Sequence, residues 1–131
     1  DGADGQGNLR LMRYADVLLM AAEALNENGK PTDALMYLNM VRERARGSST
    51  SILPDVTTTD KTQLRDKIWK ERRSELAMEQ HRWFDLARQG RQAEVMQAVG
   101  KAFVVGKHEL LPIPQVEIDL SGGVLVQNPN W

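Results

Sequence analysis

The chain has 131 residues, of which 41% are hydrophobic and 27% are charged, and this composition is typical of one globular domain rather than of a disordered or membrane-spanning chain. Seventeen Lys and Arg residues against eighteen Asp and Glu residues give a formal net charge of −1, without a basic block, so we expect no nucleic-acid partner. The absence of cysteine excludes disulfide frameworks, thiol nucleophiles and thiolate zinc sites.

The opening segment, residues 1–8, is rich in Gly and Asp and offers almost nothing to bury, so we expect a disordered linker there. Residues 9–131 are expected to form one helical domain. Because the chain has no initiator Met, we expect it to be a fragment of a longer protein.

Residues 9–28 carry apolar side chains at the i, i+3, i+4 and i+7 spacing of a buried helix face. The predicted face contains Tyr14, Val17, Leu18, Ala21, Ala22 and Leu25. Leu11, Ala15 and Leu19 widen this face, so we expect the helix to lie between two neighbours. A second helix is expected over residues 32–46, because Gly29 suits a helix end and Pro31 suits the first turn of the next helix. The two helices predict a tight hairpin that fits the roughly 34-residue tetratricopeptide pattern, although any antiparallel helix hairpin needs small residues where its axes approach.

The segment 47–59 is rich in Ser and Thr and predicts a loop. Asp60 followed by Gln63 has the spacing of a capping box, so a third helix is expected to begin there and to run through Glu79. Two shorter helices, each followed by glycine, are expected at residues 81–89 and 91–99.

Beyond Gly100 the chain changes character, because Pro112 and Pro114 push the residues before them into extended backbone. We expect an irregular tail that covers its apolar groups by packing on the helices. Those groups are Leu110, Leu111, Ile113, Ile118, Leu120 and Trp131. The expected fold class is all-α, with tetratricopeptide-like helix hairpins and an extended, irregular C-terminal tail packed on the helices.

The third helix carries carboxylates where its apolar pattern predicts a core. Leu64 and Ile68 define a buried stripe, and its continuation reaches Glu71 and Glu75. Because a buried carboxylate is costly unless it is paired, we expect cations such as Arg72, Arg73, Arg82, Arg88 or Arg13 beside them. The predicted structural network comprises Glu71, Arg72, Arg73, Glu75, His81, Arg82, Trp83 and Asp85.

The same stretch has a functional alternative, in which acid/base or metal chemistry uses Glu71, Glu75, Glu79, His81 and Asp85. We favour the structural role, because ion pairs also gather charges and no second histidine lies at ligand spacing. Trp69 and Trp83 could be sugar-stacking platforms, but aromatics within amphipathic helices are core residues much more often. We therefore predict that both are buried, and we predict no catalytic residue, metal ligand or cofactor.

Three blocks of sequence resemble a known family. The first is RYADVLLMAAEALN at 13–26, continued by LNMVRERA at 38–45. The second is IWKERRSELA at 68–77, leading into HRWFDL at 81–86. The third is KHELLPIP at 107–114, followed by Glu117-Ile118 and by Gln127-Asn128-Pro129. In this order, the blocks resemble the C-terminal part of the SusD/RagB family of outer-membrane nutrient-binding lipoproteins from Bacteroidetes.

The resemblance implies non-catalytic cell-surface binding of glycans or other nutrients, for uptake through a TonB-dependent transporter. It implies an outer-membrane location, through a lipid anchor that these residues do not contain. The ligand-contacting aromatics of the family lie upstream of this region, so no carbohydrate-binding residue is named. A tetratricopeptide-like protein–protein interaction module is the alternative.

Two positions depart from the family pattern. Gln80 stands where the family commonly has Gly, at an expected bend between helices, and this exchange is tolerable if the backbone stays helical there. Asn130 and Trp131 stand where Gly and then Tyr are usual.

Overall fold

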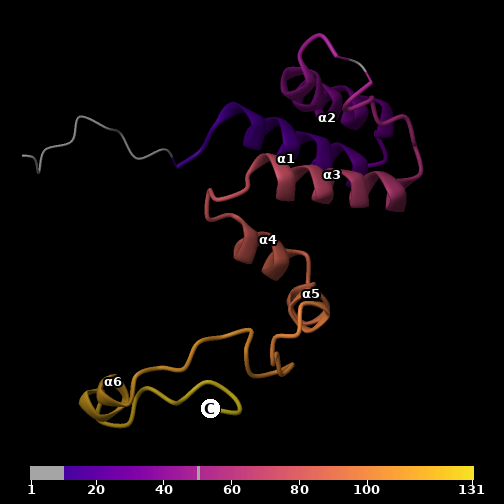
Figure 1. The fold of residues 1–131 in the computed structure, drawn as a ribbon. Helices are drawn as coiled ribbons and strands as arrows, with labels where there is room; N and C mark the ends of the chain where they lie inside the picture. The colour runs from indigo at the N-terminus through magenta and orange to yellow at the C-terminus, as the bar shows by residue number, and fades with distance from the viewer. Residues whose placement is uncertain (1–10, 50) are drawn as a thin grey trace, which may run out of the picture. The chain divides into compact units, whose positions relative to one another are not determined.

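The computed structural model describes residues 11–49 and 51–131, which form two compact units, one ending at Glu79 and the other beginning at Gln80 (Figure 1). These residues contain helices and no strand, so the predicted all-α class is confirmed. The helices are α1 (Tyr14–Glu27), α2 (Pro31–Arg46), α3 (Lys61–Glu75), α4 (Arg82–Arg88), α5 (Gln92–Ala98) and α6 (Gln115–Leu120). None of them is both long enough and apolar enough to cross a bilayer. The predicted linker, residues 1–8, lies outside the described part of the chain.

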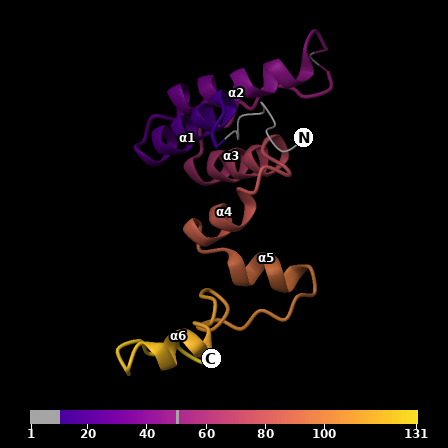
Figure 2. The ribbon, with the colours of Figure 1, turned by 90° about the vertical axis from the view of Figure 1, so that its left-hand side faces the viewer.

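In the first unit, α1 lies between α2 and α3 (Figures 1 and 2). Ala22 on α1 and Ala34 on α2 are both fully buried, and their small side chains allow the two helices to approach closely. The core around this crossing consists of Ala15, Leu18, Leu19, Ala22, Ala34, Leu38, Val41, Leu64 and Ile68. The turn between α1 and α2 uses Gly29 at φ 73°, as a helix end followed by Pro31 requires. The predicted hairpin is therefore confirmed.

The buried face of α1 is rotated from the predicted one. Tyr14 and Val17 were placed in the core, but they are 68% and 40% exposed. Ala15 and Leu19, which widen the predicted face, are buried, because α1 packs against α2 on one side and against α3 on another, as the wide face predicts. The predicted face therefore includes Tyr14 and Val17, which no described residue covers.

The capping prediction for α3 is confirmed, with one added residue. The Asp60 carboxylate accepts a hydrogen bond from the backbone N–H of Gln63 at 2.8 Å. In a capping box, the Gln63 side chain would bond the Asp60 N–H directly. Here the Thr58 hydroxyl lies between them: it accepts from the Asp60 N–H at 3.3 Å and donates to Gln63 Oε1 at 3.2 Å. The start of α3 is thus held by three side chains.

The predicted end of α3 is wrong by about one turn, because the helix stops at Glu75 rather than at Glu79. Met78 and Gln80 both adopt positive φ, 67° and 65°, which a right-handed helix does not allow. The condition for an unstrained Gln80, a helical backbone, is therefore not met. Asn130, the second departure from the family pattern, also has φ 65°. At both positions a non-glycine residue occupies backbone that favours glycine.

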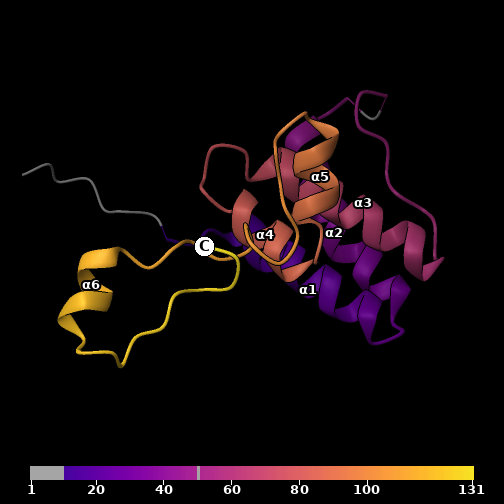
Figure 3. The ribbon, with the colours of Figure 1, turned by 90° about the horizontal axis from the view of Figure 1, so that it is seen from below.

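The second unit contains α4, α5 and α6 (Figure 3). Phe103 is buried there, its ring 6.4 Å from that of Trp83, and its backbone carbonyl accepts from the Gln97 side chain at 3.0 Å. The tail is not wholly irregular, since α6 follows directly after Pro114. A proline fits just before a helix, because the first turn needs no N–H from it.

Side-chain amides hold the two segments that flank α6. Gln127 donates to the carbonyl of Ile113 and accepts from its N–H, both at 2.8 Å, as a paired strand would do. Asn128 donates to the carbonyl of Leu111 at 2.6 Å. Leu111 and Leu120 remain 84% and 78% exposed, so the predicted covering of the tail's apolar groups is not observed for these two. Hydrogen bonds, rather than buried apolar area, connect these segments.

Candidate functional site

The carboxylate of Glu71 lies in the first unit, between α2 and α3. Its side chain is 9% exposed, and its Oε2 accepts a hydrogen bond from Arg42 Nη1 at 2.5 Å. Arg42 was not among the cations that the sequence suggested. The same guanidinium donates from Nε and Nη2 to the carbonyl of Pro54, at 3.1 and 2.7 Å. One arginine therefore connects α2, α3 and the connection between them.

Glu75, one turn further along α3, receives two arginines. Arg13 Nη1 and Arg44 Nη2 lie 2.6 and 2.5 Å from Glu75 Oε1. Arg13 also pairs with Glu79 at 2.7 Å, and it was one of the cations that the sequence suggested. The hydrogen bond to Glu79, reinforced by that to Glu75, raises the pKa of Arg13 against the opposing effect of burial. Arg13 thereby connects the start of α1 to the end of α3.

A fully buried ion pair joins α1 to α3, and sequence reasoning missed one half of it. Arg72 Nη1 lies 2.8 Å from Asp16 Oδ1, with the side chains 5% and 6% exposed. Asp16 was not among the residues predicted to form the network. The sequence does contain a pattern that points to this face: Asp16, Glu23 and Asn26 recur at helical spacing beside Leu19, which is buried.

The remaining polar side chains of this row also reach α3. Glu23 accepts from the indole N–H of Trp69 at 2.9 Å, which leaves Trp69 half-buried at the edge of the interface. Asn26 donates to the carbonyl of Lys61 at 2.9 Å. Glu27 binds Arg65 through two hydrogen bonds of 2.6 Å, and this interaction lowers the pKa of Glu27 to about 2. The α1–α3 interface is therefore polar along its length.

The other members of the predicted network have different surroundings. Arg73 is exposed and makes no ion pair within the described residues. In the second unit, Asp85 is buried and pairs with Arg88 at 2.9 Å, whereas His81 and Arg82 are half-buried. The predicted burial of Trp83 is wrong, because its side chain is 40% exposed. The prediction followed from the usual core position of aromatics in amphipathic helices, but Trp83 lies on α4, which is only seven residues long.

These carboxylates form ion pairs between helices. Glu71, Glu75 and Asp16 each accept from a guanidinium through one carboxylate oxygen. Among residues 11–49 and 51–131, no three His, Asp or Glu side chains are placed to share a metal ion. These ion pairs can fix the positions of the helices, and a ligand would bind on other surfaces of the unit.

Comparison with known proteins gives a consistent result. The family model described as the SusD family matches residues 1–131. SusD-like protein P38 of Formosa agariphila is 46% identical over 92 residues, which are 68% of this chain and 18% of the relative. SusD-like protein P2 of the same organism is 38% identical over 138 residues, which cover 100% of this chain and 27% of the relative. The chain thus spans a minor part of these relatives.

Solved structures agree with the sequence relatives. A SusD homolog from Bacteroides thetaiotaomicron superposes with a TM-score of 0.81 and 39% identity, over 92% of this chain and 26% of the other. Surface glycan-binding protein A from the same organism gives a TM-score of 0.74 and 37% identity, over 95% of this chain and 25% of the other. Since the family model covers every residue and the fold agrees, the chain belongs to the SusD family.

Proposed function

We propose that the protein containing this chain binds glycans or other nutrients at the cell surface, without covalent chemistry, and delivers them to a TonB-dependent transporter. The observation that carries the proposal is the likeness to surface glycan-binding protein A, which extends over 95% of this chain at 37% identity. Membership of the SusD family supports it. In this proposal the outer membrane is reached through a lipid anchor outside these residues.

The chemistry of the buried charges supports binding rather than catalysis. A general base needs a free lone pair within hydrogen-bond reach of the proton that it removes. The Oε1 atom of Glu75 already faces two guanidinium groups, and the Oε2 atom of Glu71 faces a third. These carboxylates therefore act as acceptors for arginine, and their role in the proposal is to hold the helices that carry the binding surfaces.

Titration of soluble polysaccharides into the protein that contains this chain, followed by calorimetry, tests the proposal. We expect saturable binding of at least one glycan, with the polysaccharide recovered at its original chain length. Absence of binding across neutral, carboxylated and sulfated polymers would contradict the proposal. Shortened products would show that the protein is an enzyme. Crosslinking in intact cells, followed by isolation of the outer membrane, tests the partner, which we expect to be a transporter barrel.

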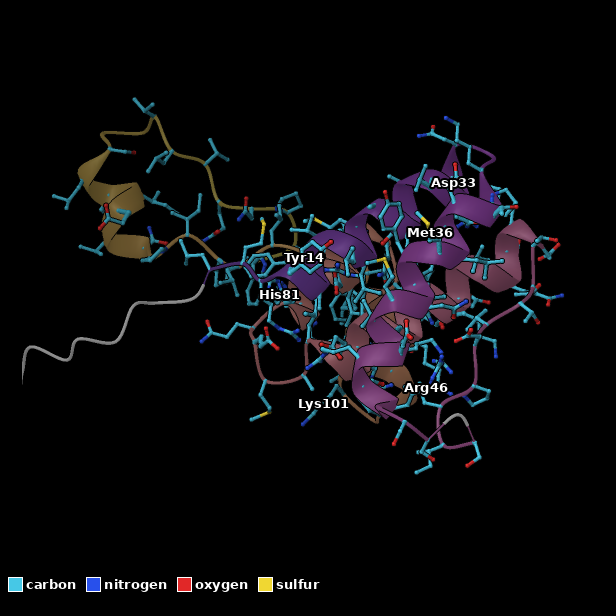
Figure 4. The ribbon with its side chains drawn as sticks, turned by 90° about the horizontal axis from the view of Figure 1, so that it is seen from above. Tyr14, Asp33, Met36, Arg46, His81 and Lys101 are labelled. Carbon is cyan, nitrogen blue, oxygen red and sulfur yellow. The ribbon has the colours of Figure 1, made fainter. Side chains whose placement is uncertain are left out.

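A second candidate function, protein–protein interaction, is favoured by one surface. Apolar side chains on the outer faces of α1 and α2 remain exposed, among them Tyr14 at 68% and Met36 at 54% (Figure 4). Exposed apolar patches commonly mark an interface. Replacing Tyr14 and Met36 together by serine separates the two functions. Loss of a tightly bound protein without loss of glycan binding would favour this second candidate over the first.

A further inference from the structure

A groove runs along α3 in the first unit, on the side that faces the connection from α2. We call residues 53–58 of this connection the strap; its course can be followed in Figures 1 and 3. The strap and the C-terminal half of α2 form one wall, α3 forms the other, and the groove encloses about 620 Å³. This volume lies within the range of about 300–1,000 Å³ that small-molecule sites occupy.

The strap is held in place by side chains of α2. Asn39 donates to the carbonyl of Val56 and accepts from its N–H, both at 2.9 Å. Arg42 donates twice to the carbonyl of Pro54, and Arg46 donates to the carbonyl of Leu53 at 3.0 Å. Because backbone groups of Leu53, Pro54 and Val56 are hydrogen-bonded to α2, the strap is a preformed wall that a ligand would not need to order.

The α3 wall presents a polar row toward the strap. Gln63, Lys67, Lys70 and Ser74 all line the groove, at intervals of four, three and four residues, which place them on one helix face. Eleven residues of helix rise by about 16 Å. The groove can therefore contact an extended chain along its length, rather than a single small group.

The charges in the groove do not balance. Glu71 and Glu75 line it, but Arg42 neutralises the first, and Arg13 and Arg44 neutralise the second. Asp55 on the strap pairs with Arg46. By contrast, Lys67 and Lys70 are exposed and have no hydrogen bond or ion pair with any residue that the structure describes. Two lysines without an ion pair among the described residues thus line the groove.

We propose that this groove binds an anionic oligosaccharide, whose carboxylate or sulfate groups pair with Lys67 and Lys70. The proposal rests on the proposed glycan-binding function and names a ligand class and a site for it. Ser74 and Thr57, whose hydroxyls also have no partner among the described residues, supply neutral hydrogen bonds to sugar hydroxyl groups.

The lining also argues against a neutral glycan in this groove. Its residues are Arg42, Ala45, Leu53, Pro54, Asp55, Val56, Thr57, Thr58, Gln63, Lys67, Lys70, Glu71, Ser74 and Glu75. None of them is aromatic, so no flat apolar face is available for a sugar ring. Recognition must come from charge and hydrogen bonding, and the unpaired charge is positive.

The test uses the protein that contains this chain and isothermal titration with four polymers. Polygalacturonate carries carboxylates, dextran sulfate carries sulfates, dextran is neutral, and polyglutamate is an anion without sugar. The groove variant combines Lys67→Ala with Lys70→Ala. The matched control combines Arg73→Ala with Lys30→Ala, which removes the same charge from exposed residues that do not line the groove.

We expect the groove variant to bind the recognised anionic polysaccharide at least tenfold more weakly, because one charge-assisted hydrogen bond is worth about a factor of ten. The control should change affinity less than twofold. Comparing polygalacturonate with dextran sulfate identifies the anionic group. Wild-type affinity should also fall as salt is raised.

Any one of the following results would overturn the proposal. Equal losses in the groove variant and the control, or equally strong binding of polyglutamate, would show non-specific ion exchange. Binding of an anionic glycan that the groove variant leaves unchanged would place the site elsewhere. Binding of dextran alone would refute the anionic class while the proposed glycan-binding function stands, whereas absence of binding to all three polysaccharides would refute both.

Discussion

Replacing Arg42 by alanine is expected to destabilise the first unit far more than replacing Arg44, although both arginines lie on α2 and both donate to a glutamate of α3 at 2.5 Å. The difference comes from burial. The side chains of Arg42 and Glu71 are 15% and 9% exposed, whereas that of Arg44 is 67% exposed. Only in the first pair are both side chains shielded from water, because Glu75 is 7% exposed but Arg44 faces solvent.

The structure sets the two magnitudes. Without Arg42, the nearly buried carboxylate of Glu71 has no other ion pair among the described residues, and breaking such a pair costs about 3–5 kcal/mol. The carbonyl of Pro54 loses its two donors as well. Without Arg44, Glu75 keeps Arg13 at 2.6 Å, and an exposed pair is worth about 0.2–1 kcal/mol.

Native-state hydrogen exchange of the α3 amides measures this difference in the protein that contains the chain, because it reports the local free energy of opening. We expect Arg42→Ala to lower the free energy of opening by at least about 2 kcal/mol more than Arg44→Ala does. Glu71→Ala should fall in the same range as Arg42→Ala. A loss below about 1 kcal/mol in Arg42→Ala, or equal losses in the two arginine variants, would refute the reasoning from burial.

Three further changes have expected outcomes. Gln80→Gly should raise stability by about 1 kcal/mol in thermal unfolding, because left-handed backbone costs a residue with a Cβ roughly 1–2 kcal/mol; a loss would contradict this. Asp60→Ala should cost about 1 kcal/mol in urea unfolding through its lost N-cap, and no change would contradict the cap. The hydrogen bond from Arg65 lowers the pKa of Glu27 from 4.5 to about 2, so its stabilising effect is complete above about pH 4.5 and is lost as the pH falls through about 2. Arg65→Gln should therefore raise the Glu27 pKa in a carboxyl NMR titration, and an unchanged pKa would assign the shift to Lys61.

The elements that could be predicted are those that local sequence determines. Asp60 with Gln63 defines the start of α3, and Gly29 with Pro31 defines the turn between α1 and α2, because capping and left-handed backbone depend on neighbouring residues. The end of α3 was less predictable. Residues 76–79 have helical composition, and the positive φ of Met78 contradicts it.

The candidate site was predicted less completely, because a buried carboxylate indicates that it needs a cation without indicating which one. Glu71 was singled out correctly as buried, yet its partner Arg42 comes from a different helix. Asp16 was missed because a row of polar residues at helical spacing fits a solvent-facing edge as well as a buried interface, and only the position of its partner Arg72 distinguishes the two. Pairing between helices depends on how they cross, and periodicity within one helix does not contain that information.

The polar contacts between α1 and α3 determine how far α3 is shifted along α1. Asp16 meets Arg72, Glu23 meets Trp69, and Glu27 meets Arg65, in the reversed order that antiparallel helices require. Sliding α3 by one turn, about 5.4 Å, would break all of these contacts together, whereas Leu19 could pack against other apolar groups after the same shift. Buried ion pairs add little net stability, but they discriminate strongly between registers. These charges therefore select one arrangement of the helices, and that arrangement fixes the α3 wall on which Lys67 and Lys70 stand.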